Sequence, residues 1–189
     1  MLNKILEWDQ ELFLLLNGLG SEVYDSFWVF VSSTKSALPL FVFITYLLFK
    51  TFGRSFWQAL LLILITVGLV DFCSVYCFKN VFMRLRPCHA PELADQIRLL
   101  VSKGGVYGFV SSHAANFFAL AAICTAILPE RKFIFYLLYS WAIFVAYSRI
   151  YVGKHYLLDV LGGAILGLVI AKVMWRLVKK IKEKYTLAL

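Results

Sequence analysis

Charged residues are scarce in this sequence. Asp, Glu, Lys and Arg make up only 16% of its 189 residues, whereas hydrophobic residues make up 61%. A soluble domain is about half apolar and about a quarter charged. Together with a mean hydropathy of +0.79, this composition argues against an ordinary soluble domain. It predicts a single all-α domain over residues 1–189, built as a polytopic membrane helix bundle.

Several other features are missing. No small-residue cleavage site follows the first apolar run, so we expect no removed signal peptide. There is no repeat, no low-complexity tract and no soluble second domain. Three of the four cysteines lie in apolar runs, where a small buried thiol is the ordinary interpretation. The sequence therefore predicts no disulfide, no zinc or other metal site and no cofactor.

Five apolar runs are near or within the ~17–25 residues that a bilayer requires. They cover residues 36–52, 57–78, 113–128, 133–151 and 157–178. Before them, residues 1–35 are predicted to form an interfacial segment, because Trp8, Leu12 and Leu15 share one helical side opposite acidic residues. The stretch "YDSFWVFVSS" is either half-inserted or part of a sixth span. We favour the first interpretation, and so five spans rather than six.

Charge orients this bundle. The net charge is +8, and from Lys172 to Lys184 the chain carries six basic residues and one Glu. The sequence predicts that this tail, residues 179–189 included, contacts lipid headgroups in the cytoplasm; nucleic acid is not an expected partner. With five spans, the acidic N-terminus and the 79–112 and 152–156 connections fall on the outer face. A 34-residue connection is unusual unless it has a function.

Three polar stretches meet on that outer face. In the last one, His155 and Asp159 are four residues apart, so they can touch at the start of a helix. An Asp bonded to one imidazole nitrogen leaves the other free as an acceptor or nucleophile. A purely structural alternative is an Asp that accepts hydrogen bonds from free N–H groups near a helix start, beside a surface His. The pair alone does not decide between the two.

The two earlier stretches favour the chemical interpretation. In "VSSHAAN", Ser111 or Ser112 is a good N-cap, and a helix N-terminus binds anions; His113 follows in the first turn. In "KNVFMRLRP", three cations gather on the face that the charge bias disfavours, which indicates an anionic ligand. With Arg149 added and no acidic cluster present, the sequence predicts a metal-free phosphoryl-transfer site.

These stretches resemble the three motifs of the type 2 phosphatidic acid phosphatase family. K-x6-R-P is matched by Lys79, Arg86 and Pro87, and S-R-x5-H-x3-D by Ser148, Arg149, His155 and Asp159. P-S-G-H is matched in part, since Val110 and Ser112 replace its Pro and Gly. The first change should affect rigidity, and the second should limit how closely the backbone approaches phosphate. The resemblance covers residues 57–178, the predicted catalytic bundle.

The resemblance implies a phosphatase that uses His155 as nucleophile, Asp159 as its orienting partner and His113 as general acid. It also implies a set of phosphate-binding residues: Lys79, Arg86, Ser111, Ser112 and Arg149. The expected substrate is a lipid phosphate whose tail stays in the bilayer. By analogy we favour undecaprenyl diphosphate, with lipid A, phosphatidylglycerophosphate and phosphatidic acid as alternatives. A protein that binds or flips lipid phosphates without hydrolysis is a further alternative. A vanadate-dependent haloperoxidase, which has a similar site, is soluble and is disfavoured by this composition.

Overall fold

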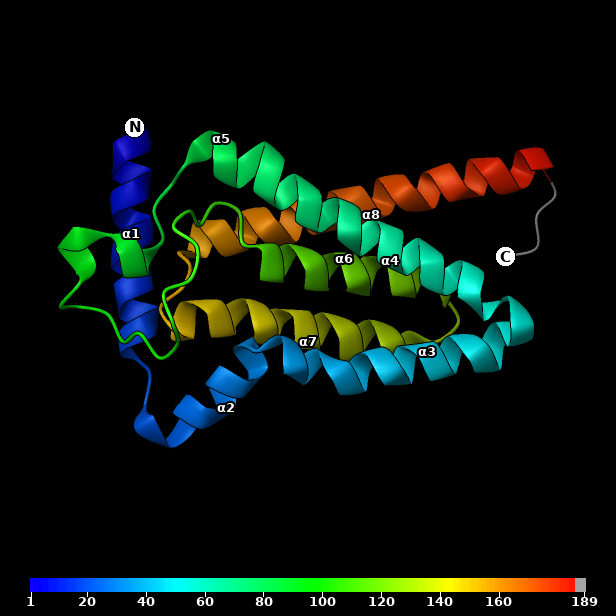
Figure 1. Ribbon diagram of the computed structural model, residues 1–189, viewed down its shortest axis with the longest axis horizontal. Helices are drawn as coiled ribbons and strands as arrows, with labels where there is room; N and C mark the ends of the chain where they lie inside the picture. Colours follow the sequence, from blue (N-terminus) through cyan, green and yellow to red (C-terminus); the bar gives the residue numbers. More distant parts are fainter. Residues whose placement is uncertain (186–189) are drawn as a thin grey trace.

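Five long helices run side by side along the longest axis of the molecule in the computed structural model (Figure 1), which describes residues 1–185 except the side chains of Leu2, Lys182, Lys184 and Tyr185. The helices are α3 (Leu38–Phe52), α4 (Phe56–Cys73), α6 (Ser112–Ile127), α7 (Lys132–Tyr151) and α8 (Leu157–Tyr185). Their bounds lie close to the five predicted spans, except that α8 continues well into the basic tail. Residues 186–189 of the predicted tail lie outside the described residues.

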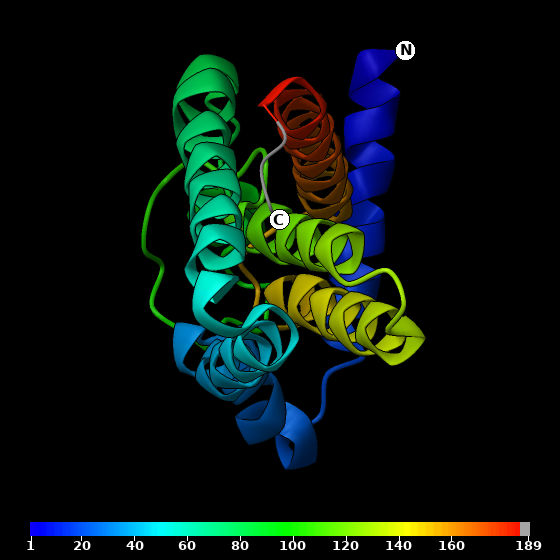
Figure 2. The same ribbon diagram turned by 90° about the vertical axis from the view of Figure 1, so that its right-hand side faces the viewer.

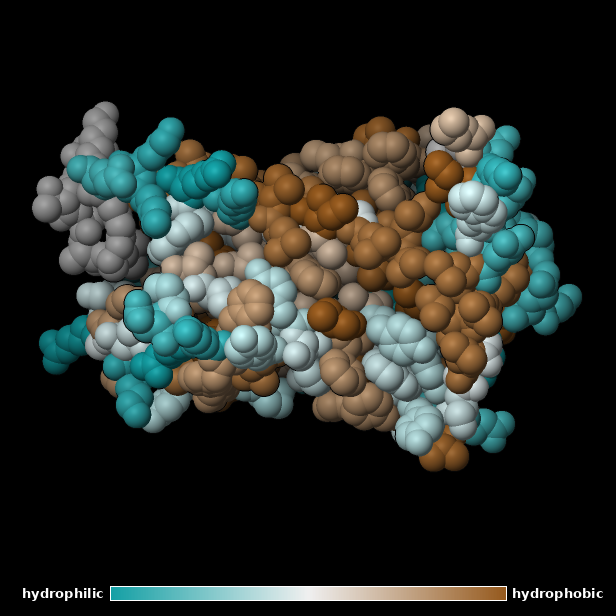
Figure 3. Space-filling view, turned by 180° about the vertical axis from the view of Figure 1, so that it is seen from behind, coloured by the Kyte–Doolittle hydropathy of each residue, from teal (hydrophilic) through white to brown (hydrophobic). Residues whose placement is uncertain are grey.

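Three stretches of the described chain are long and apolar enough to cross a membrane: Thr34–Phe82, Lys132–Tyr151 and Leu157–Ile181. The first folds back on itself at η2 (Gly53–Ser55), so it contributes both α3 and α4 (Figure 1). Apolar side chains form a band between two hydrophilic ends on the face seen in Figure 3. The protein is thus an all-helical membrane protein, and the number of its crossings, five, remains a prediction.

Helix α6 is the central helix of the bundle. In the end-on view of Figure 2 it lies among α4, α7 and α8, and it packs against all three. Small residues make this possible: Ala115 and Ala119 are fully buried, and Gly163 and Gly167 face them from α8. Small side chains let helix backbones approach closely in a membrane, where packing drives association. The N-terminus of α6 is thereby held against the N-terminus of α8.

Two N-terminal helices close one end of the bundle. Helix α1 (Leu2–Gly18) lies across that end, and α2 (Glu22–Ser32) runs obliquely to η1 (Thr34–Ala37) (Figure 1). One side of α1 is buried through Phe13 and Asn17, whose amide donates to backbone carbonyls at the end of α7. The predicted apolar side, with Trp8 and Leu15, is exposed. An exposed apolar side on a helix across the bundle end fits the predicted interfacial position.

The long connection after α4 covers the same end as α1 (Figure 1). Helix α4 continues through a π-helical segment, η3 (Ser74–Lys79), into the short α5 (Asn80–Phe82). The chain then forms η4 (Pro87–His89) and η5 (Pro91–Leu93) before it reaches α6. An antiparallel bridge pairs Leu85 with Tyr107. This bridge folds the predicted 34-residue connection back over the bundle end.

Candidate active site

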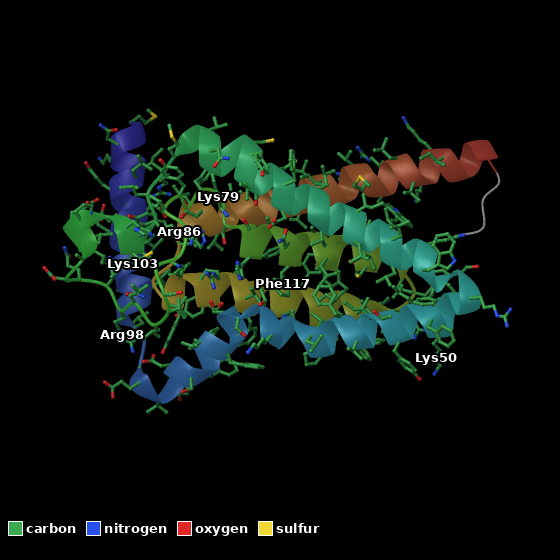
Figure 4. All side chains as sticks on the ribbon, viewed as in Figure 1. Lys50, Lys79, Arg86, Arg98, Lys103 and Phe117 are labelled. Atoms are coloured by element: carbon green, nitrogen blue, oxygen red, sulfur yellow. The ribbon has the colours of Figure 1, made fainter. Side chains whose placement is uncertain are left out.

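All three sequence motifs lie at the end of the bundle that α1 closes. Lys79 ends η3, Ser111 caps α6, Arg149 lies in the last turn of α7, and the His155–Asp159 stretch begins α8. In Figure 4, Lys79 and Arg86 lie close together at this end, with Arg98 and Lys103 further out and Lys50 at the opposite end. These four segments, together with Arg86 of the long connection, therefore supply one polar site.

His155 and Asp159 form the predicted pair. His155 Nδ1 lies 3.3 Å from Asp159 Oδ2, which also accepts the Tyr156 N–H at 3.2 Å. Both side chains are enclosed, with exposed fractions of 1% and 0%. Burial, and then the positive charges of Arg149 and Arg86, hold the pKa of His155 well below its usual value. This favours a neutral imidazole with Nδ1–H directed at the carboxylate, which leaves Nε2 available as an acceptor or nucleophile.

The start of α6 lies against this pair. Ser111 caps the helix by accepting from the Ala114 N–H at 3.5 Å, and its own N–H donates to the Asp159 carbonyl at 2.8 Å. His113 follows in the first turn, within electrostatic range of both His155 and Arg149. A helix N-terminus with free N–H groups beside two histidines suits a bound phosphate.

Ser112, which departs from the family motif, has a defined place. Its hydroxyl accepts from the Lys79 ammonium and shares a 2.7 Å hydrogen bond with Ser74. The side chain thus points at η3 and positions Lys79. The sequence predicts Ser112 as a possible N-cap and a phosphate-binding residue but does not predict this contact, because it joins residues that are 33 positions apart.

The cations around His155 lack carboxylate partners. The ion pairs among the described side chains include none of Lys79, Arg86, Arg149 and Lys154. Arg149, 7% exposed, donates to Ser32, and its buried Nε has no partner. Arg86 donates to the Tyr107 carbonyl at 3.0 Å. A buried charge without a counter-ion is costly, so this arrangement is suited to an anion.

Lys154 was not among the predicted site residues, although it lies within the third motif. Its buried ammonium donates to the carbonyls of Ser102, at 2.7 Å, and Lys103. Burial lowers its pKa. Lys154 ties the long connection to the start of α8 and adds positive charge near the site. Its location between Arg149 and His155 was the only signal available in the sequence.

Arg84 and Asp9 are the other site residues that sequence reasoning missed. Arg84 donates to Asp159 Oδ1 at 2.9 Å and to Asp9 Oδ2 at 2.7 Å. Asp9 also accepts the Leu158 N–H at 3.0 Å, at the first turn of α8. Arg84 was counted among the cations of the first motif, but its two carboxylates make it a structural cation rather than a phosphate ligand. A buried Asp on α1 in register with Phe13 and Asn17 was the available signal.

Comparisons with known proteins identify the family of this chain. A family model described as the PAP2 superfamily matches residues 55–183. A lipid A 4'-phosphatase of Porphyromonas gingivalis is 32% identical over 176 residues, which cover 91% of this chain and 73% of the relative. An undecaprenyl-diphosphatase of Bacillus subtilis is 27% identical and covers 88% and 82%. The crystal structure of a Bacillus subtilis PAP2-type phosphatidylglycerolphosphate phosphatase superposes with a TM-score of 0.72 at 24% identity, covering 95% and 89%.

Proposed function

Because this chain belongs to the PAP2 superfamily and is an integral membrane lipid phosphatase, we propose that it hydrolyses a phosphate monoester of a lipid A-type glycolipid through a phosphohistidine at His155. The observation that carries the mechanism is the group of cations without carboxylate partners around a buried, neutral histidine. A phosphate dianion supplies the negative charge that this group lacks.

The reaction has two steps. His155 Nε2 attacks phosphorus, the P–O bond to the lipid breaks, and His113 donates a proton to the leaving oxygen. Water then attacks the phosphohistidine, His113 takes its proton, and inorganic phosphate leaves. Asp159 holds Nδ1–H and stabilises the positive charge that develops on the ring. Lys79, Arg86, Arg149 and the N–H groups at the start of α6 stabilise the equatorial oxygens.

The substrate assignment rests on similarity. The 32% identical relative acts on lipid A, and the undecaprenyl-diphosphatase is more distant at 27%. Undecaprenyl diphosphate, which the sequence alone favoured by analogy, is therefore the second candidate. A protein that only binds or flips lipids would use the cations but has no need of His155 paired with Asp159. Charge distribution supports a site on the outer face of a bacterial cytoplasmic membrane, with the basic tail in the cytoplasm.

Phosphate release in detergent with EDTA tests this proposal. Lipid A, undecaprenyl diphosphate, phosphatidylglycerophosphate and phosphatidic acid are compared as substrates. We expect release without added metal, fastest from lipid A, and none from His155→Ala. His113→Ala should be slower by ~10²–10⁴-fold and should accumulate labelled phosphoenzyme. Near-normal activity of His155→Ala would overturn the mechanism, and no release from any lipid would favour the binding or flipping alternative.

A further inference from the structure

A carboxylate on an apolar helix of the bundle belongs to none of the three motifs. Asp71 is exposed on α4, two residues from its end, in a run that is otherwise apolar. Its Oδ1 accepts from the Asn116 side-chain amide of α6 at 3.1 Å. Among the described residues, no other side chain donates to Asp71, and the Asn116 carbonyl oxygen has no partner. Ionisable groups at membrane depth are costly and mark functional positions.

This pair is the lower of two polar contacts that join α4 and its continuation η3 to α6. The upper contact is the 2.7 Å hydrogen bond between Ser74 and Ser112, which also holds Lys79 of the phosphate site. Asp71 and Asn116 lie three and four residues further along their helices, which is ~5 Å deeper in the bundle. A lipid whose phosphate binds at the upper contact has its first acyl linkages at the depth of the lower one.

An apolar cavity continues from the same place. It has a volume of about 150 Å³ and is lined by Asn116, Phe117, Leu120, Val67 of α4 and residues of η1 and α3. Phe117 is labelled in the interior of the bundle in Figure 4. An apolar cavity of this size accommodates a benzene-sized hydrocarbon group, so it suits the upper part of one acyl chain.

We propose that Asp71 and Asn116 form a subsite for a hydrogen-bond donor in the lipid, next to the hydrolysed phosphate. Both oxygens that lack a donor are acceptors, and the low dielectric of the bundle strengthens a bond to them. A phosphorylated amino sugar with amide-linked or hydroxylated acyl chains carries such donors within a few bonds of the phosphate. The linkages of glycerolipids offer ester oxygens, which only accept, and a polyprenyl chain offers hydrocarbon. Asp71 and Asn116 therefore select the phosphorylated amino sugar lipid. This inference rests on the proposed phosphatase function.

Two synthetic glycolipid phosphates test the subsite. They share the sugar, the phosphate and the chain length, and differ only in whether the neighbouring acyl chain is joined by an amide or by an ester. We expect the wild-type protein to prefer the amide lipid by about tenfold to a hundredfold in kcat/KM, the range of a hydrogen bond to a charged group. Asp71→Leu and Asp71→Asn should bring the ratio towards one, mostly through the KM of the amide lipid.

Thr45→Val is the matched control. It removes a polar group from α3 whose hydroxyl bonds only its own helix, at 2.8 Å to the Phe41 carbonyl, so the ratio should stay at its wild-type value. Hydrolysis of both lipids by the wild type at equal kcat/KM would overturn the subsite and leave the phosphatase intact. An equal loss on both lipids in the Asp71 variants would overturn it too, because Asp71 would then act only as a counter-charge to Lys79. If the wild-type protein hydrolyses neither lipid, the proposed phosphatase function is overturned instead.

Discussion

Arg84 shows how much a single side chain organises in this site. Its guanidinium bridges Asp159 and Asp9 and also stacks on the Tyr156 ring, with Cζ 4.1 Å from the ring centroid. Asp159 therefore accepts from Arg84 through Oδ1, while Oδ2 bonds His155 and accepts the Tyr156 N–H. The orientation of His155, the proposed nucleophile, therefore depends on Asp9 of a different helix, which acts through Arg84.

Asp9→Asn should lower kcat about tenfold and leave KM nearly unchanged, because it weakens the charge-assisted bond to Arg84. Steady-state kinetics on lipid vesicles measure this split, and a double variant with Arg84→Gln should lose less than the sum of the two single losses. Glu11→Gln, at an exposed position of the same helix, is the control. A raised KM with an unchanged kcat would show that Asp9 does not position the catalytic pair.

The pKa of His155 determines the acid side of the pH profile. Burial and the surrounding cations lower this pKa, so the ring stays neutral until the pH falls well below the usual value of ~6.5. The acid limb of kcat/KM should therefore lie below that pH. Arg149→Gln removes a positive neighbour, so the pKa rises and the limb moves to higher pH. If the acid limb of kcat/KM stays at the same pH in this variant, a group other than His155 is responsible for it.

At the scale of elements, the contact between α6 and α8 brings two motifs together. A Cβ added at Gly167 would lie 2.1 Å from the Ala115 carbonyl oxygen, and one at Gly163 would lie 2.4 Å from the Ser111 carbonyl oxygen. No side chain fits there unless the helices separate. Such a separation would move Ser111 and His113 away from the His155–Asp159 pair, so this contact holds the site as well as the fold.

Gly167→Ala should destabilise the protein by about 1–3 kcal/mol, the usual cost of overpacking, and should lower activity in parallel. Thermal unfolding in detergent, followed by the loss of soluble protein, gives the comparison. Gly68→Ala is the control, because a Cβ on this α4 glycine would meet nothing within 4 Å. Alanine there should leave stability unchanged or raise it. Equal effects of the two substitutions would contradict the packing argument.

The sequence was sufficient for the helices and for the motif residues, because apolar periodicity and short-range spacing determine both. The predicted spans 113–128 and 133–151 differ from α6 and α7 by at most one residue at either end. The sequence did not predict the contacts between distant segments. Nothing in the sequence indicated that Asp9 would meet Arg84, 75 positions away, or that the hydroxyl of Ser112 would hold Lys79. Such contacts follow from how the helices pack, which spacing along the chain does not encode.

At the scale of the whole molecule, opposite ends carry different charges. Lys50 and the end of α8 lie away from the site, while α1 and α2, whose sequences carry acidic residues, lie at the site end (Figures 1 and 4). A green fluorescent protein fused to the C-terminus should therefore fluoresce, because it folds in the cytoplasm. A periplasmic alkaline phosphatase fused at the same point should be inactive. The reverse result would invert the proposed orientation.

Helix α1 has its apolar side outward and its Asp9 inward, where it supports the catalytic carboxylate. With α1 at its predicted interfacial position, we expect the surface of the lipid bilayer to hold in place the helix that presents Asp9 to Arg84. Transfer to a detergent that leaves α1 unsupported would slow turnover while the five-helix bundle persists. In this proposal, the membrane both delivers the lipid substrate and keeps His155 in register.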